Sequence, residues 1–96
     1  MKLNDKTLLK TNALINGEWI PSDTNDVLSV RNPATGDIIS EVAKSSANQT
    51  RIAIEASADA MLDWKNLPAK ARANLLRTWF ELMMTNQEDL AKIMTA

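Results

Sequence analysis

Apolar side chains recur at helical spacing through the second half of the chain, most densely between residues 68 and 85. Two rows with a spacing of four run along this stretch: Leu75, Trp79, Met83 and Leu76, Phe80, Met84. Because a helix turns once per 3.6 residues, the two rows lie side by side and form one broad apolar face. The pattern predicts a helix over residues 68–85 whose face some other surface must cover.

The same period predicts two further helices, so that residues 46–95 are read as helical. Residues 49–66 carry two rows of mostly small side chains: Ala53, Ala56, Ala60, Trp64 and Ile54, Ala58, Met61. The first row would let a neighbouring helix approach closely. Ser46 and Gln49 have the spacing of a capping box, and Pro68 is expected at the first position of the next helix. Asn86 is expected to cap a third helix over residues 87–94.

Before residue 44 the apolar period is two, which predicts strands. Asn16-Gly17 between short apolar flanks is typical of a type I′ hairpin turn, because both central residues need positive φ. Residues 27–31 are expected to form a half-buried strand that returns over residues 38–42 through a turn with Gly36 in the left-handed position. Residues 13–43 therefore read as two antiparallel hairpins, too small to be stable without a partner surface.

Residues 1–12 fit either a short amphipathic helical turn or an extended arm, and the sequence does not choose between them. At the other end, the apolar face of the third helix runs up to Thr95-Ala96 with no glycine, proline or polar tail after it. The chain is therefore expected to be an interrupted piece of a larger protein.

Composition excludes several kinds of chemistry. The 96 residues include no cysteine and no histidine, which removes thiol nucleophiles, disulfides and the commonest general base and metal ligand. Eleven basic against twelve acidic residues leave a formal charge of −1 without a basic cluster, so neither nucleic acid nor a membrane surface is an expected partner. No secretory signal or membrane span is visible, and a cytoplasmic location is expected.

The remaining candidate residues have simpler explanations than catalysis. Glu55, Asp59 and Asp63 lie one helical turn apart, but a solvated polar face is the better interpretation of them. Glu88-Asp89 suits the positive end of a helix dipole. Arg72 shares the apolar face of the second helix, where it can bind an acidic ligand, pair with a carboxylate or extend across the face.

Three further features also read as structural. The turn at residues 32–36 has one glycine and precedes a strand, so it is not a phosphate cradle. An exposed ion pair between Arg77 and Glu81 is expected to contribute roughly 0.2–0.5 kcal/mol. The methionine and aromatic side chains at helical spacing favour core packing over a binding surface.

Five short motifs follow one another in a specific order. They are Ile15-Asn16-Gly17-Glu18-Trp19, Asn32-Pro33-Ala34-Thr35-Gly36, an alanine-rich helix ending in Trp64, Arg72 with Leu75-Leu76, and Asp89-Leu90-Ala91. In that order they resemble the N-terminal segment of the NAD(P)-dependent aldehyde dehydrogenases over nearly the whole chain. Within that family, Leu3-Asn4-Asp5, Ala13-Leu14 and residues 77–84 are most similar to bacterial succinate-semialdehyde dehydrogenases.

The resemblance implies an α/β enzyme with a Rossmann-type cofactor domain, a catalytic domain and an oligomerisation arm. Such an enzyme oxidises an aldehyde through a cysteine thiohemiacetal, passes hydride to the nicotinamide, and hydrolyses the thioester with a glutamate as base. Residues 1–96 would then be the N-terminal part of the cofactor-binding domain, without the catalytic domain. No catalytic, cofactor-binding or metal-binding residue transfers to this chain, so the chain alone is expected to be inactive and to bind neither NAD nor NADP.

The partners implied by the resemblance are the remainder of the chain and, when complete, further copies in a homo-oligomer. The substrate is expected to be succinate semialdehyde. The alternative is a small non-catalytic interaction module that binds another protein through the Trp79/Phe80/Met83 face. A truncated reading frame without function is a third interpretation.

Overall fold

The structure, a computed structural model, describes residues 1–96 and consists of two hairpins followed by three helices, as expected. A single 3₁₀ turn at Lys6–Leu8 is present in the N-terminal arm, which was expected to be either helical or extended. The elements in chain order are β1 (Ala13–Ile15), β2 (Glu18–Ile20), β3 (Val27–Arg31), β4 (Ile38–Ala43), α1 (Ala47–Trp64), α2 (Ala69–Thr85) and α3 (Gln87–Thr95).

The first hairpin has the turn that its sequence predicts. Asn16 and Gly17 have φ values of 51° and 78°, as a type I′ turn requires. Antiparallel pairing places Leu14 opposite Trp19 and Ile15 opposite Glu18. Ile15 is the one buried hydrophobic residue of the whole chain, so this hairpin holds what little core there is.

The second hairpin also turns where expected, with Gly36 at φ 80°. The turn is closed by the Asn32 N–H, which donates to the Asp37 carbonyl at 2.8 Å, and by the Gly36 N–H, which donates to the Asn32 carbonyl at 2.7 Å. The expectation of a half-buried strand at residues 27–31 is wrong for this chain, because all five residues of β3 are exposed. No other element covers either face of β3.

Helix α1 begins with the capping box that its sequence predicts. The Gln49 N–H donates to the Ser46 hydroxyl at 3.1 Å, and the Gln49 side-chain oxygen accepts from the Ser46 N–H at 3.3 Å. The alanine row of α1 faces a different neighbour from the one expected. Ala53 and Ala56 are half-buried against β1, so the small side chains allow a hairpin to approach, where a helix was expected.

The junctions between the helices differ in detail from the sequence expectation. Pro68 was expected at the first helical position of α2. It is instead the N-cap, and the helix begins one residue later, at Ala69. Asn86 sits between α2 and α3, but its side chain does not cap α3; its amide instead donates to the Leu82 carbonyl at 2.9 Å. The Asn86 side chain therefore extends the hydrogen bonding of α2, and the start of α3 has no side-chain cap.

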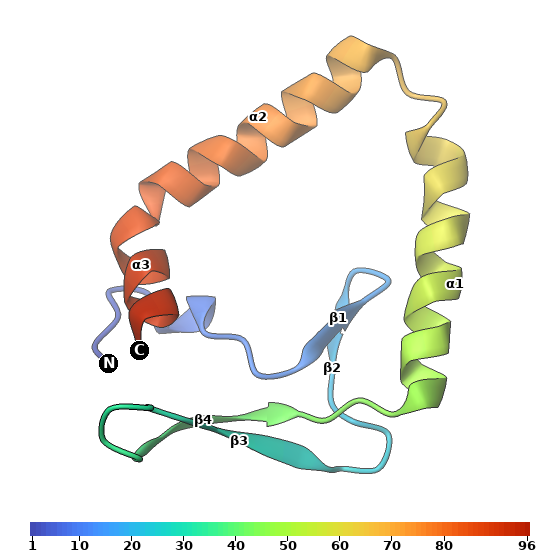
Figure 1. Ribbon diagram of the computed structural model, residues 1–96. Helices are drawn as coiled ribbons and strands as arrows, with labels where there is room; N and C mark the ends of the chain where they lie inside the picture. Colours follow the sequence, from blue (N-terminus) through green and yellow to red (C-terminus); the bar gives the residue numbers. More distant parts are fainter.

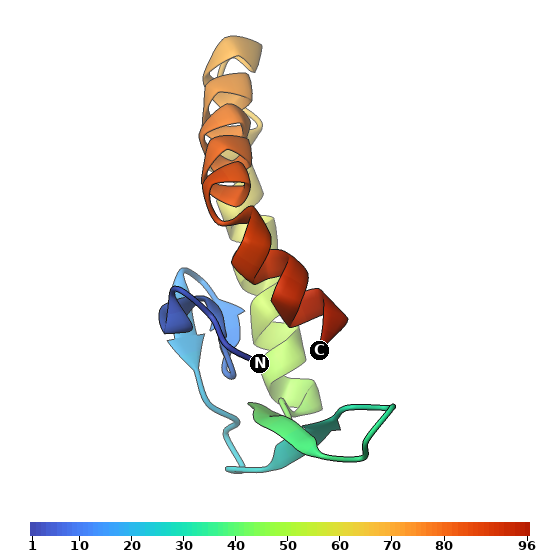
Figure 2. The same ribbon diagram turned by 90° about the vertical axis from the view of Figure 1, so that its left-hand side faces the viewer.

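The elements form an open arc, with α1 and α2 diverging from residues 65–68 and the hairpins closing the opposite side (Figure 1). Figure 2 shows the same arc edge-on, with α3 bent away from the α2 axis. The radius of gyration is 16.5 Å, against about 12.5 Å for a compact chain of this length. Four residues of 96 are buried, and three of those are polar. This chain therefore has no hydrophobic core of its own.

Candidate functional site

The acidic residues of α1 lie on its solvent-exposed side. Glu55, Asp59 and Asp63 are all exposed along one side of the helix. No group of three or more Asp, Glu, His or Cys side chains is arranged to hold a metal ion. No helix of the structure is both long and apolar enough to cross a membrane. The solvated-face interpretation of these carboxylates agrees with their exposure.

The two glycines of the chain do not build a nucleotide site. A dinucleotide cradle needs a glycine-rich turn that leads from a strand into a helix N-terminus. Gly17 and Gly36 lie instead in turns between antiparallel strands. In the second turn the Asn32 side-chain oxygen accepts from the Ala34 N–H at 2.9 Å, and Arg31 donates to the Gly36 carbonyl at 3.0 Å. Neither turn therefore has the arrangement of a dinucleotide cradle.

Gln49 connects α1 to the loop before β3. Its side chain is buried, accepts from the Asp23 N–H at 3.1 Å and donates to the Pro21 carbonyl at 2.9 Å. The Ser46 hydroxyl adds a bond of 2.7 Å to the Asp23 carboxylate. The Gln49 side-chain amide therefore supplies hydrogen-bond partners to both the start of α1 and the loop. The sequence indicated the capping box but gave no sign of the loop contacts.

Asp89 joins the two ends of the chain. One carboxylate oxygen accepts from the Asn4 N–H at 2.9 Å and the other from the Asp5 N–H at 2.8 Å. The N–H groups of Asp5 and Asn4 lower the pKa of Asp89 below its ordinary value of 3.8, because they stabilise the charged form. Helix-dipole complementarity was expected to explain this residue fully; the structure adds a contact across 85 positions. We call this contact the Asp89 clasp.

Arg72 does not pair with a carboxylate within this chain. The one ion pair in the chain joins Arg77 and Glu81 at 3.4 Å, as expected from their spacing. The Nε–H of Arg72 is shielded from water and has no hydrogen-bond acceptor. A buried donor without an acceptor costs about 1–3 kcal/mol in a folded protein. Arg72 is thus the one polar side chain whose buried atom this chain leaves unsatisfied.

The apolar side chains of α2 are exposed, although the sequence favoured core packing for them. Trp79 is 62% exposed, Phe80 53% and Met83 48%. Core packing within these residues is therefore wrong, because α1 and α2 diverge and no strand reaches α2. Twenty large hydrophobic residues are exposed in total, and seven of them belong to α2.

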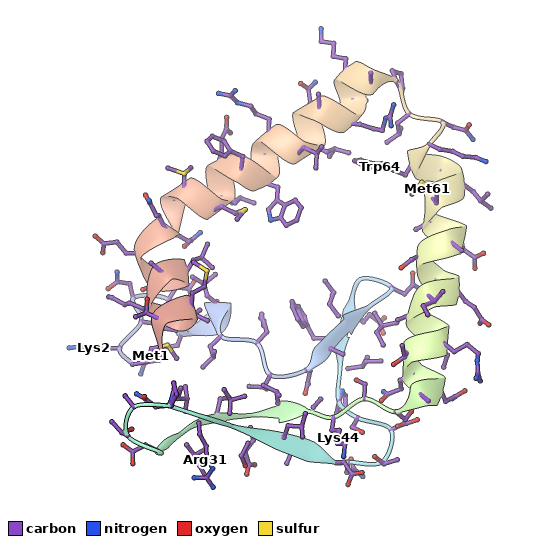
Figure 3. All side chains as sticks on the ribbon, in the orientation of Figure 1. Met1, Lys2, Arg31, Lys44, Met61 and Trp64 are labelled. Carbon is purple, nitrogen blue, oxygen red and sulfur yellow. The ribbon has the colours of Figure 1, made fainter.

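The depressions on the surface are open and lie on different elements of the arc. An open one of about 470 Å³ lies at the end of α1, lined by Ser57, Ala60, Met61, Asp63, Trp64 and Leu67. Figure 3 shows Met61 and Trp64 there, where the chain turns toward α2. Another, of about 420 Å³, surrounds the Asp89 clasp and is mostly polar. Both depressions are better described as uncovered surface than as substrate pockets.

Comparison with known proteins gives consistent matches. The model of the aldehyde dehydrogenase family matches residues 19–96. The chain is 50% identical over 95 residues to the NADP(+) succinate-semialdehyde dehydrogenase GabD of Escherichia coli, covering 99% of this chain and 20% of that protein. It is 48% identical over 95 residues to a glutarate-semialdehyde dehydrogenase of Pseudomonas aeruginosa, with the same two shares.

A solved structure agrees with these sequence matches. The succinate-semialdehyde dehydrogenase of Burkholderia pseudomallei superposes on this chain with a TM-score of 0.94 at 41% identity. The superposition covers 99% of this chain and 20% of that one. The chain therefore spans about a fifth of the length of the relatives it matches, and its open arc is the shape that this segment has within a much longer polypeptide.

Proposed function

This chain belongs to the aldehyde dehydrogenase family, and from that premise we propose that it forms the N-terminal part of the cofactor-binding domain of an NAD(P)-dependent enzyme. That enzyme oxidises an aldehyde to its carboxylic acid and, when complete, assembles as a homo-oligomer in the cytoplasm. Residues 1–96 contribute to its folding and none of its chemistry. The observation that carries the proposal is the close structural match over almost all of this chain and only a fifth of the relative.

The substrate proposed for the complete enzyme is succinate semialdehyde. Support comes from the names of the relatives, which also include a glutarate-semialdehyde dehydrogenase of nearly equal identity. The two substrates differ by one methylene, a difference worth only about 1–3 kcal/mol in a well-fitted pocket. Succinate semialdehyde is the smaller of the two, and the relative with the highest identity quoted above is named for it.

A chimera tests the positive half of this proposal. Residues 1–96 replace the aligned segment of E. coli GabD, and oxidation of succinate semialdehyde is followed by NADPH absorbance. We expect kcat and KM close to those of intact GabD, because no residue of this chain takes part in the reaction. An insoluble or inactive chimera, with intact GabD active beside it, would contradict the proposal.

The purified 96-residue chain tests the negative half. It is expected to show no turnover with succinate semialdehyde and NAD or NADP, and no heat of binding with either cofactor in calorimetric titration. Measurable turnover, or binding in the micromolar range, would show that cofactor-binding residues were overlooked.

The exposure of Trp79, Phe80 and Met83 also fits the alternative, a small interaction module. The two functions differ in what the isolated chain does. A module with its own stability unfolds cooperatively as a monomer or a discrete dimer. A family segment without its partner surface exposes free strand edges and apolar side chains, and it is expected to aggregate or to unfold without cooperativity.

A further inference from the structure

We propose that the apolar face of α2 binds the remaining four fifths of an aldehyde dehydrogenase fold, even when that part is supplied as a separate chain. The face consists of Leu75, Leu76, Trp79, Phe80, Leu82 and Met83. Arg72 is the polar anchor in this interface. The inference rests on the proposed function and goes beyond it. It names the surface that binds, the residue that donates a hydrogen bond across the interface, and the occupant.

The size of the uncovered surface argues for a large occupant. A compact monomer of this mass exposes about 5,500 Å², whereas this chain exposes 7746 Å². The difference of roughly 2,300 Å² is well above the ~800 Å² that each partner buries in a standard interface. The excess is better matched by a body that packs against the whole arc than by a second copy of this chain meeting it along one helix.

The backbone conformation argues for the identity of that occupant. The chain superposes closely on a segment that lies within a polypeptide about five times as long. Its helices diverge here in the same way, and no strand of this chain packs against the apolar face of α2 (Figure 1). The arc therefore has the shape that the matching segment takes in the relative, where a longer polypeptide surrounds it.

The two sides of α2 differ clearly in chemistry. One side carries Lys70, Asn74, Arg77 and Glu81, and its Arg77–Glu81 pair is 73% and 64% exposed. Arg72 lies on the other side, three residues before Leu75 and seven before Trp79, so helical spacing places it in line with the apolar face. A cation in that position faces the occupant and not the solvent.

The unsatisfied Nε–H identifies what the occupant must supply. That donor is already shielded from water within this chain and has no acceptor. When the apolar face becomes covered, an unpaired guanidinium would be strongly unfavourable, so the occupant must present a carboxylate or a backbone carbonyl to it. Arg72 thereby favours an occupant whose apolar surface carries one hydrogen-bond acceptor opposite the Arg72 guanidinium.

Co-expression tests the docking. A tagged copy of residues 1–96 is produced together with E. coli GabD from which the aligned segment has been deleted. We expect the deleted GabD to become soluble and to co-purify in a 1:1 ratio. Trp79→Asp should abolish co-purification, whereas Asn74→Asp, which adds the same charge on the solvent side of α2, should leave it unchanged.

Competition tests the anchor. Wild-type and variant chains of distinguishable mass compete for a limiting amount of the deleted GabD, and mass spectrometry of the purified complex gives their ratio. Arg72→Met is expected to be incorporated about 10- to 100-fold less than wild type, the loss expected for one hydrogen bond to a charged group. Equal incorporation of Arg72→Met would overturn the anchor.

The outcomes separate this inference from the proposed function. No co-purification, or a discrete homodimer of residues 1–96 that excludes the deleted GabD, would overturn the docking even if the covalent chimera is active. A 1:1 complex that obeys the Trp79 and Asn74 variants supports the docking even if the complex does not oxidise succinate semialdehyde, in which case the proposed activity fails alone.

Discussion

Replacing Trp79 by alanine is expected to have little effect in the isolated chain and a large destabilising effect in the complete fold. Trp79 is 62% exposed here, so its removal deletes few contacts and should leave the far-ultraviolet circular dichroism of the isolated chain almost unchanged. Covering that exposed part removes roughly 150 Å² of apolar surface from water, which is worth about 4 kcal/mol at 25 cal/mol per Å². Trp79→Ala in the GabD chimera should therefore cost about 3–5 kcal/mol.

Urea denaturation of the chimera measures the loss of stability, and the far-ultraviolet circular dichroism of the isolated chain measures its helix content. The isolated chain and the chimera are compared with and without Trp79→Ala, and Asn74→Ala on the solvent side of α2 is the matched control. Quenching of Trp79 fluorescence by iodide, in variants with Trp19 and Trp64 replaced by phenylalanine, should be strong in the isolated chain and weak in the chimera. A loss under 1 kcal/mol in the chimera, or iodide quenching as strong in the chimera as in the isolated chain, would refute the assignment of α2 as a surface that the rest of the fold covers.

Two further predictions concern the polar contacts. Hydrogen bonds from the Asp5 and Asn4 N–H groups hold the pKa of Asp89 below its ordinary value of 3.8. The contribution of the Asp89 clasp to the stability of the folded state is therefore present above pH 3.8 and is lost as the pH falls through the lowered pKa. The amide chemical shift of Asn4 should report this step, and Asp89→Asn should remove it; a step that persists in Asp89→Asn would contradict the clasp. Gln49→Ala should destabilise the chimera by about 1–3 kcal/mol, because it leaves buried polar groups without partners, and Thr50→Ala is the control, since the Thr50 hydroxyl bonds only within the helix. A loss equal to that of the control would show that the loop finds other partners.

Local sequence predicted the elements of this fold well. Asn16-Gly17 gave a hairpin turn, Ser46 and Gln49 gave a capping box, and Arg77 and Glu81 gave an ion pair. Each of these depends on residues no more than four positions apart, so the physical cause lies within the motif. The three helices likewise follow from apolar period and from Pro68, although α1 spans Ala47–Trp64 where residues 49–66 were expected, and α2 begins at Ala69.

Contacts between distant residues were not predictable in the same way. No local pattern distinguishes Asp89 from other acidic residues in a first helical turn, yet its partners are 84 and 85 positions away. The prediction that Asn86 caps α3 was wrong, because its side-chain amide donates to the Leu82 carbonyl of α2. The alanine row of α1 allowed any close neighbour, and only the path of the chain decided that the neighbour is β1.

The absence of catalytic residues in residues 1–96 stays a prediction, and so do the domain boundaries. What supports it is the composition, which lacks cysteine and histidine, and the position of both glycines between antiparallel strands. The proposed assays with cofactor and substrate decide it.

By itself the sequence determined two hairpins, three helices and the family to which the chain is similar, because these depend on spacing and on short motifs. Only the tertiary structure decided whether the apolar face of α2 is a core. Periodicity shows that a face is apolar but not what lies opposite it. In this chain α1 diverges and nothing lies opposite Trp79, so a side chain that reads as core is exposed, and Arg72 beside it has a buried donor without an acceptor.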